Sequence, residues 1–221
     1  MAGELNPKHE QLVRDMLRKG VVTFGEPQEL RDRTSTAYVD LREAISLPGI
    51  FDDIVSAYRD TLNRNVHMVI QPSGRRRFMA GIPETALYYT GALAVQLGSQ
   101  VPLLQRRVKP KEHGKPKVIE GRYEEGDEVF LVDDVITLGG TKLDEIERYK
   151  AVGLRVTGIV ALVDREQGGR TELESHGIDF ASAMTLRGIA QYALAEKLGG
   201  VTQTLYDEFF SELDPNEINP E

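Results

Sequence analysis

Two adjacent carboxylates, Asp133 and Asp134, stand directly after a short apolar run at 129–132 and before a glycine- and threonine-containing segment at 137–141. The apolar run is rich in β-branched and aromatic residues, which is typical of a strand buried on both faces of a parallel sheet. A glycine-containing turn lets backbone amides converge, and the N-terminus of a following helix adds partial positive charge. The segment therefore suits a phosphate group, and the two carboxylates suit ribose hydroxyls or a hydrated Mg²⁺.

The elements that must position these residues form one βαβ unit. Apolar residues recur at helical spacing after residue 141, and Gly153 is a natural residue to end that helix. A second strand at 156–163 ends in Asp164 and Arg165, so the polar residues gather where strands give way to loops, the usual ligand edge of an open α/β sheet. On spacing alone, another interpretation is equally open: the carboxylates merely end a strand, and the threonines and glycines cap a helix.

A family resemblance favours the ligand site. The run Val132–Thr141 resembles the phosphoribosyl pyrophosphate (PRPP) motif of type I phosphoribosyltransferases, and within that group it is most similar to the orotate phosphoribosyltransferase family. The further stretches that carry the resemblance, in family order over about residues 20–190, are Phe24–Glu26 with Tyr38–Arg42, Gly81–Leu87, Arg106–Gly114 with Ile119–Gly121, and Asp164–Gly169. Neither Gly-x-x-x-x-Gly-Lys-Ser/Thr nor Gly-x-Gly-x-x-Gly is present, which disfavours ordinary nucleoside triphosphate and dinucleotide sites.

The resemblance implies an α/β protein with a type I phosphoribosyltransferase-like fold. Its central sheet would be mostly parallel and flanked by helices, with a small N-terminal hood region and a flexible catalytic loop. We expect a single phosphoribosyltransferase domain over 1–221, which comprises an N-terminal helix and hood region (1–36), an α/β core (37–198), and a C-terminal helix with an acidic tail (199–221).

The implied reaction is Mg²⁺-dependent transfer of the 5-phosphoribosyl group from PRPP to orotate. Its products would be orotidine 5′-monophosphate and pyrophosphate, in de novo pyrimidine (UMP) biosynthesis. Two alternatives stay open: a phosphoribosyltransferase for another base, and a PRPP-binding regulatory protein without turnover. Lys111 and His113 speak against the second alternative, because mere 5′-phosphate binding has no use for them.

Site residues follow from the resemblance position by position. The implied catalytic residues are Arg107, Lys111, His113, Asp133 and Asp134. The implied PRPP- and phosphate-binding residues are Lys109, Val135, Ile136, Thr137, Leu138, Gly139, Gly140 and Thr141. Arg165, together with Thr137, would contact orotate, since a guanidinium can pair with a carboxylate or carbonyl. Mg²⁺ would be held by Asp133 and Asp134, directly or through water.

Three places depart from the family pattern. Val108 stands where a lysine usually follows the arginine, with Lys109 one place on, and the closest match to Leu-Lys-Ser-Gly is Leu30–Arg33. Glu84 follows Gly81–Pro83, where the family commonly has tyrosine. A carboxylate close to pyrophosphate would be costly unless it met Mg²⁺ or the Arg75–Arg77 run.

The segment Arg106–Pro116 is basic, contains proline and is too polar to pack in a core. A long loop of this kind between strands is expected to close over a ligand. The resemblance implies that it crosses to the neighbouring subunit, and we therefore expect a homodimer with shared active sites.

Composition limits the function classes. The net charge of −8 disfavours a nucleic-acid binder, and local basic loops on an acidic protein fit capture of a small polyanion. The chain has no cysteine, and its four histidines show no metal-ligand spacing. No apolar stretch approaches the roughly 20 residues of a membrane helix. We expect a cytoplasmic protein without membrane or nucleic-acid partners.

Periodicity and breaker residues give the remaining expected elements. The expected helices are 6–19, 48–62, a helix entered at 81–83 and reaching 97, 170–176, 185–198 and 201–213. The expected strands are 21–24, 37–41, 66–70, 101–105, 118–120 and an edge strand at 178–183, with a loop or ragged hairpin at 28–36.

Overall fold

The computed structural model describes residues 5–29, 34–69, 74–98, 100–108 and 118–211. The elements in chain order are η1 (Pro7–His9), α1 (Glu10–Arg18), β1 (Val22–Glu29), β2 (Thr34–Val39), α2 (Leu41–Ala44), α3 (Pro48–Arg64), η2 (Val66–Met68), β3 (Arg77–Gly81), α4 (Ala86–Gln96), β4 (Gln105–Arg106), β5 (Ile119–Glu120), β6 (Glu128–Ile136), α5 (Gly140–Lys150), β7 (Arg155–Asp164), α6 (Gly169–Ser175), β8 (Asp179–Thr185), α7 (Leu186–Ala195) and α8 (Gln203–Ser211). Among the described residues, no helix is both long and apolar enough to cross a membrane.

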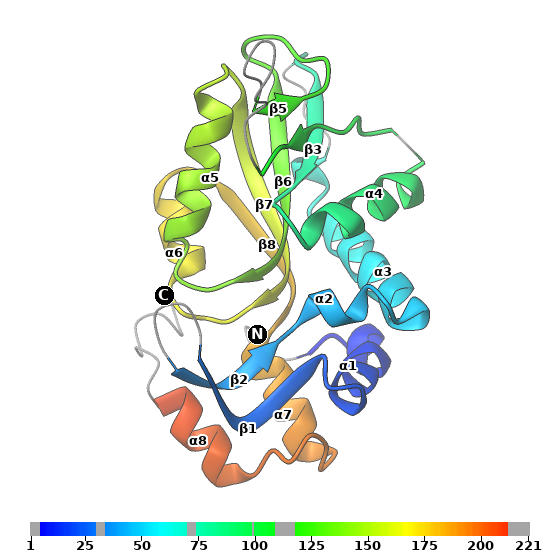
Figure 1. The fold of residues 1–221 in the computed structure, drawn as a ribbon, viewed down its shortest axis with the longest axis vertical. Helices are drawn as coiled ribbons and strands as arrows, with labels where there is room; N and C mark the ends of the chain where they lie inside the picture. The colour runs from blue at the N-terminus through cyan, green and yellow to red at the C-terminus, as the bar shows by residue number, and fades with distance from the viewer. Residues whose placement is uncertain (1–4, 30–33, 70–73, 99, 109–117, 212–221) are drawn as a thin grey trace.

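The main sheet has four parallel strands in the order β3-β6-β7-β8, which confirms the expected α/β fold. Helices α5 and α6 lie on one face, and α3 and α4 lie on the other (Figure 1). The strand predicted at 129–132 is the inner strand β6, and the edge strand predicted at 178–183 is β8. Strands β6 and β7 are buried along nearly their whole length, as a parallel sheet covered on both faces requires.

Alternating side chains of β6 supply both layers of the core. Phe130 and Val132 pack with residues of α3 and α4, whereas Val129 and Leu131 pack with residues of α5. This is the period-two alternation of a strand. The same alternation decides on which face of the sheet the side chain of each residue at the end of β6 lies.

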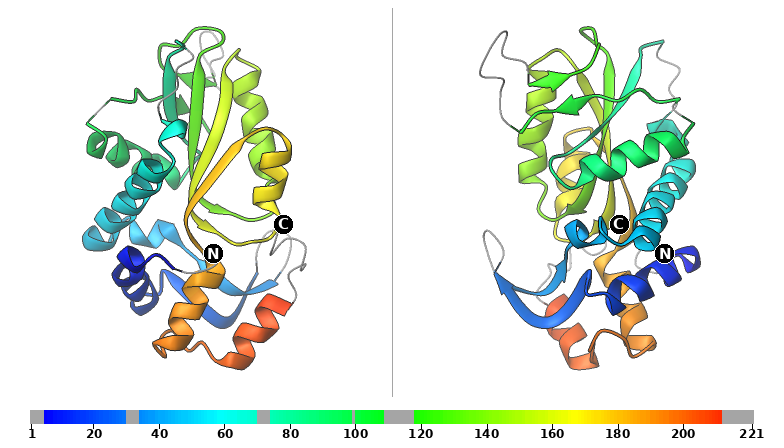
Figure 2. Two further views of the ribbon diagram at one scale, coloured as in Figure 1. Left: turned by 180° about the vertical axis from the view of Figure 1, so that it is seen from behind. Right: turned by 45° about the vertical axis from the view of Figure 1, so that its right-hand side comes forward.

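The hood is the antiparallel hairpin β1–β2, which lies beyond the carboxyl ends of the sheet strands, next to α7 and α8 (Figures 1 and 2). Of the segment 28–36, predicted as a loop or ragged hairpin, residues 28–29 belong to β1 and residues 34–36 to β2, and residues 30–33 lie outside the described residues. The register shifts between Phe24 and Gln28, at a place that contains Gly25 and Pro27. An irregularity of this kind bends a strand and breaks the alternation that sequence patterns rely on.

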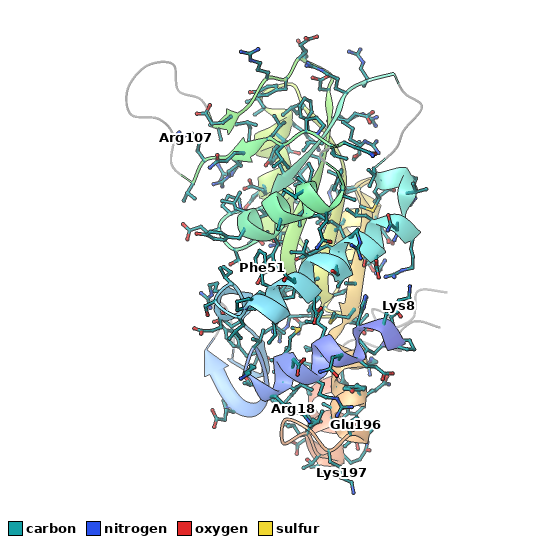
Figure 3. All side chains as sticks on the ribbon, turned by 90° about the vertical axis from the view of Figure 1, so that its right-hand side faces the viewer. Lys8, Arg18, Phe51, Arg107, Glu196 and Lys197 are labelled. Atoms are coloured by element: carbon teal, nitrogen blue, oxygen red, sulfur yellow. The ribbon has the colours of Figure 1, made fainter. Side chains whose placement is uncertain are left out.

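Tyrosines fix the helices against the ligand edge. The Tyr58 hydroxyl on α3 donates to the carbonyl oxygen of Asp133 at 2.6 Å, and the Tyr89 hydroxyl on α4 donates to that of Leu41, the first residue of α2, at 2.7 Å. Phe51 stacks on Tyr89 with ring centroids 5.0 Å apart, and Figure 3 labels Phe51 on α3. The start of α2, which follows the hood, and the end of β6 are thus held by the same pair of packed helices.

The strand predicted at 66–70 is wrong. Residues 66–68 form the short 3-10 helix η2, and the strand is β3, which begins at Arg77. The burial of Arg77 is compensated by hydrogen bonds: Glu128 accepts from its guanidinium at 2.6 Å, and two carbonyls of η2 accept from it as well. A short apolar run does not distinguish a strand from a turn by periodicity, and a buried arginine hides a true strand.

The strand predicted at 101–105 is also largely wrong. Only Gln105 and Arg106 form a strand, β4, which pairs with β5. The residues just before β4 run beside β3 and contact it through an isolated parallel bridge between Met79 and Leu103. The proline at position 102 lacks a backbone donor, and that limits a ladder here.

His9 gives the fold a pH dependence. It is 3% exposed against α3, and burial lowers the pKa of its ring, with Arg64 lowering it further. As the pH falls below about 6.5, His9 therefore takes up a proton in the unfolded chain at a higher pH than it does in the folded protein. We expect His9 to lower stability as the pH falls from 7 to 5, so a His9→Gln variant should lose less stability than wild type over that range in urea titrations. Equal slopes of stability against pH in the two proteins would contradict this.

Candidate active site

The phosphate loop, residues 137–141, joins the end of β6 to the start of α5, as predicted. Gly139 adopts a left-handed conformation with φ of 81°, and its carbonyl accepts from the backbone N–H groups of Lys142 and Leu143. No side chain caps α5 at Gly139, and its first turn carries no acidic residue. The amides and the positive end of the helix dipole are therefore well placed to bind an anion.

The turn after β7 packs against this loop. A β-carbon on Gly169 would lie 2.4 Å from the carbonyl oxygen of Thr137 and 2.4 Å from Cγ2 of Ile136. Only glycine lets the start of α6 approach the backbone of the phosphate loop so closely. The Asp164–Gly169 stretch thus positions the phosphate loop through Gly169.

The two carboxylates point in different directions. Asp133 is 2% exposed and forms an ion pair with Lys142 of α5, with Oδ2 and Nζ 2.5 Å apart. Asp134 is only half-buried, and it lies on the opposite face of β6, near Tyr89 of α4. Burial raises the pKa of Tyr89, and the nearby charge of Asp134 raises it further. Burial also raises the pKa of Asp133 to about 6, against the lowering effect of Lys142. Of the pair, Asp134 therefore has the more exposed carboxylate.

Sequence reasoning missed Lys142. It stands three residues after Gly139, in the first turn of α5, where the helix dipole disfavours a cation. A lysine at such a position signals a compensating carboxylate nearby, and Asp133 was available for that role. The sequence signal for this pair is thus the lysine in the first turn of a helix.

Arg165 lies between the sheet and the hood. Its side chain is buried and donates to the carbonyl oxygen of Ala37 at 3.1 Å and to Oγ of Ser35 at 2.8 Å, both in β2. Its backbone N–H donates to Ile136 at the end of β6. The structure therefore brings Arg165 to the phosphate loop and to the hood, while its contact with orotate stays a prediction.

The hood also places a polar cluster near Asp134. The Arg42 guanidinium donates to both carboxylate oxygens of Asp40, at 2.8 and 2.7 Å, and to the Tyr38 hydroxyl at 2.6 Å. Asp40 raises the pKa of Arg42, and Asp134 adds to this effect. These residues belong to a stretch that carried the family resemblance, but none of them was singled out for the site.

The Gly81–Pro83 turn adjoins the end of β6. The backbone N–H of Ile82 donates to the carbonyl of Val132 at 2.8 Å, and a β-carbon on Gly81 would lie 2.6 Å from Oγ1 of Thr90. Glu84 is exposed. Arg76 and Arg77 do not reach it, because they pair with Asp127 and Glu128 at the amino ends of the strands.

The predicted basic loop is only partly described. Lys109, Lys111 and His113 lie outside the described residues. Arg107, labelled in Figure 3, is half-exposed on the stem of the loop, where its guanidinium donates to Glu120 at 3.3 Å. Arg106 pairs with the buried Glu145 of α5 at 2.7 Å, so the stem is fixed to the helix that follows the phosphate loop.

The predicted Mg²⁺ site fits the carboxylates unequally. The described residues contain no group of three or more side chains that could hold a metal ion. Mg²⁺ is often held by one or two carboxylates together with substrate phosphates and water. Asp134 suits that role, since one of its oxygens accepts from its neighbour's backbone and the side chain is partly exposed. Asp133 suits it poorly, because a lysine already occupies its Oδ2.

Comparisons with known proteins agree on one family. No protein-family model matches the chain. The orotate phosphoribosyltransferase of Pyrococcus horikoshii is 31% identical over 174 residues, which cover 77% of this chain and 87% of that protein. The orotate phosphoribosyltransferase structure from Aeropyrum pernix matches with a TM-score of 0.66 at 25% identity, over 81% of this chain and 96% of that one.

A longer relative is matched over part of its length. The uridine 5′-monophosphate synthase of Caenorhabditis elegans is 32% identical over 201 residues, which cover 88% of this chain and 39% of that protein. The chain thus spans about two fifths of the length of such relatives.

Proposed function

Because this chain belongs to the orotate phosphoribosyltransferase family, we propose that it transfers the 5-phosphoribosyl group of PRPP to orotate, with orotidine 5′-monophosphate and pyrophosphate as products. This would be a step of UMP biosynthesis, in the cytoplasm. One observation carries the proposal: the phosphate loop, the half-buried Asp134 and the hood meet at the carboxyl edge of the sheet. The site thus combines an anion-binding turn with a carboxylate for the ribose, under a hairpin that can cover a base.

The reaction breaks the bond between ribose C1 and pyrophosphate while a ring nitrogen of the base attacks C1. Positive charge develops on the ribose, and negative charge grows on the leaving group. The protein must hold both partners, exclude water and stabilise the departing charge. No side chain needs to act as a nucleophile.

Each proposed role uses a residue of this chain. Residues 137–141 bind the 5′-phosphate, and Asp133 and Asp134 serve the ribose side, where Asp134 accepts hydrogen bonds from its hydroxyls. Arg107, with Lys111 and His113 by family position, neutralises the pyrophosphate as it leaves. Arg165, beside the hood, pairs with a carboxylate or carbonyl of the base. Mg²⁺, which Asp134 would hold together with water and substrate, would supply positive charge that offsets the charge of the pyrophosphate.

A direct assay tests this function. Purified protein is incubated with PRPP, Mg²⁺ and orotate, and orotate consumption is followed, with uracil and purine bases as controls. Turnover with orotate alone is the expected result. Preference for another base would identify a related transferase, and PRPP binding without turnover on any base would indicate a regulatory protein.

We further propose a homodimer with shared active sites. Tyr88 and Leu103 expose large apolar side chains, and Leu103 lines a cavity of about 480 Å³, together with residues of β3, α4 and the loop stem that include Gly81, Thr90, Leu104 and Gly121. Apolar surface of this kind beside a functional loop favours a protein partner, and a second copy would bring its own basic loop.

Mixing two inactive variants tests the shared site. Lys111→Ala should lower turnover sharply but leave 5′-phosphate binding nearly intact, because it acts on the departing pyrophosphate. Asp133→Asn/Asp134→Asn should disable the other half of the site. After subunit exchange, a heterodimer has one site with both intact halves, so activity should return to roughly a quarter of wild type in an equal mixture. A monomer in light scattering, or no recovery despite proven exchange, would contradict the shared site.

A further inference from the structure

Lys142 occupies a position that elementary electrostatics disfavours. It is in the first turn of α5, where unpaired backbone N–H groups and the helix dipole create partial positive charge. Its side chain is nevertheless largely buried, with 15% exposed. A buried ammonium is costly unless an opposite charge and hydrogen bonds compensate it. Something other than helix stability must account for this lysine.

Its partner is Asp133, at 2.5 Å. The carboxylate is 2% exposed, and the carbonyl of the same residue accepts from the Tyr58 hydroxyl at 2.6 Å. Asp133 is therefore fixed by α3 through its backbone and by α5 through its side chain. An aspartate held in this way is a rigid anchor for Lys142.

The ion pair spans the phosphate loop. Asp133 lies in β6 before residues 137–141, and Lys142 follows them directly. The two ends of the loop are thus connected by a buried contact, in addition to the support that Gly169 gives from α6. A contact that closes a short segment in this way restricts the conformations that its backbone amides can adopt.

We infer that Lys142 is a positioning residue: by pairing with Asp133 across the loop, it holds residues 137–141 in the conformation that receives the 5′-phosphate. Asp133 then acts through Lys142, and Asp134 is the carboxylate left to meet the ribose. This inference rests on the proposed function only in that the loop's ligand is a ribose 5-phosphate group. It does not depend on which base is transferred.

The first experiment compares Lys142→Met with Lys150→Met. Lys150 lies on the same helix and pairs with Glu147 at 2.7 Å, but both side chains of that pair are exposed, so its loss should have little effect. The probe is ribose 5-phosphate, measured by calorimetry on the full-length protein. We expect Lys142→Met to weaken its binding by roughly tenfold, the usual scale for losing a group that orients a binding residue. Equal affinities of the two variants would overturn the inference.

Lys142→Met also leaves Asp133 buried without a partner, so its melting temperature should fall, by about 10 °C. The double variant Asp133→Asn/Lys142→Met removes both charges and should regain most of that loss. If Lys142 only stabilises the fold, ribose 5-phosphate binding will recover together with the melting temperature. If it positions the loop, binding will stay weak in the stable double variant, and that is the expected result.

Steady-state kinetics separate this inference from the proposed function. A loop that binds the 5′-phosphate equally in the ground and transition states should, when loosened, raise KM for PRPP with little change in kcat. A wild-type protein active on orotate, with unchanged KM in Lys142→Met, would overturn only the inference. A wild-type protein that binds ribose 5-phosphate but does not consume orotate would overturn only the function.

Discussion

Replacing Gly169 with alanine will impair PRPP use by displacing the phosphate loop, although residue 169 makes no direct contact with substrate in our proposal. The added methyl group would lie 2.4 Å from the Thr137 carbonyl oxygen and from Cγ2 of Ile136, and a backbone carbonyl of a tight turn cannot give way cheaply. Either the loop or the start of α6 must move. A displacement of about 1 Å can cost roughly 100-fold in rate, and we expect kcat/KM for PRPP to fall on that scale.

Gly49→Ala is the matched control for this substitution. A β-carbon there meets no atom within 4 Å, and the position is in the first turn of α3, away from the ligand edge. Stability of Gly169→Ala should fall by about 1–3 kcal/mol, as for other overpacked sites, so activity is to be measured well below its melting temperature. Wild-type kcat/KM in Gly169→Ala would show that α6 does not support the phosphate loop.

The βαβ unit and the phosphate loop could be predicted because their signals are local. The buried strand, the glycine in a left-handed turn and the following helix each depend on neighbouring residues only. The structure confirms the strand, the glycine turn and the helix, with Gly139 at φ 81° between β6 and α5, while phosphate binding at this turn stays a prediction. The family resemblance added the hood and the order of the motifs, which local patterns do not contain.

The missed features depend on contacts between distant residues. Arg77 reads as part of a solvated basic run until Glu128, 51 residues away, is placed beside it in the sheet. The sequence also gives no sign that Arg165 contacts the hood, where Ala37 and Ser35 accept from its guanidinium. Adjacent carboxylates look equivalent in a sequence, but the alternation along β6 places one beside Lys142 of α5 and the other near Tyr89 of α4. Contacts of this kind can be recognised only once the fold is known.

The difference between the carboxylates leads to the second large prediction, for Asp134→Asn. Asparagine keeps the size of the side chain and an oxygen that can accept from the backbone N–H of Val135, so the end of β6 should keep its shape. What disappears is the negative charge that the ribose hydroxyls, and any hydrated Mg²⁺, would meet. Loss of a charged group that stabilises a transition state typically costs roughly 10²–10³-fold in kcat, and we expect a loss of that size.

Asp144→Asn serves as the control, because it removes a carboxylate that is exposed on α5. Turnover should remain close to wild type in that variant, and the melting temperatures of both variants should lie close to that of wild type. Asp133→Asn gives the discriminating comparison, since it leaves Lys142 without its partner and should lower stability as well as PRPP affinity. The expected result is that Asp134→Asn loses kcat but keeps its stability, whereas Asp133→Asn mainly loses stability and PRPP affinity. That difference would establish that the two neighbouring carboxylates have different roles. If Asp134→Asn kept activity within a few-fold of wild type, Asp134 would merely end a strand.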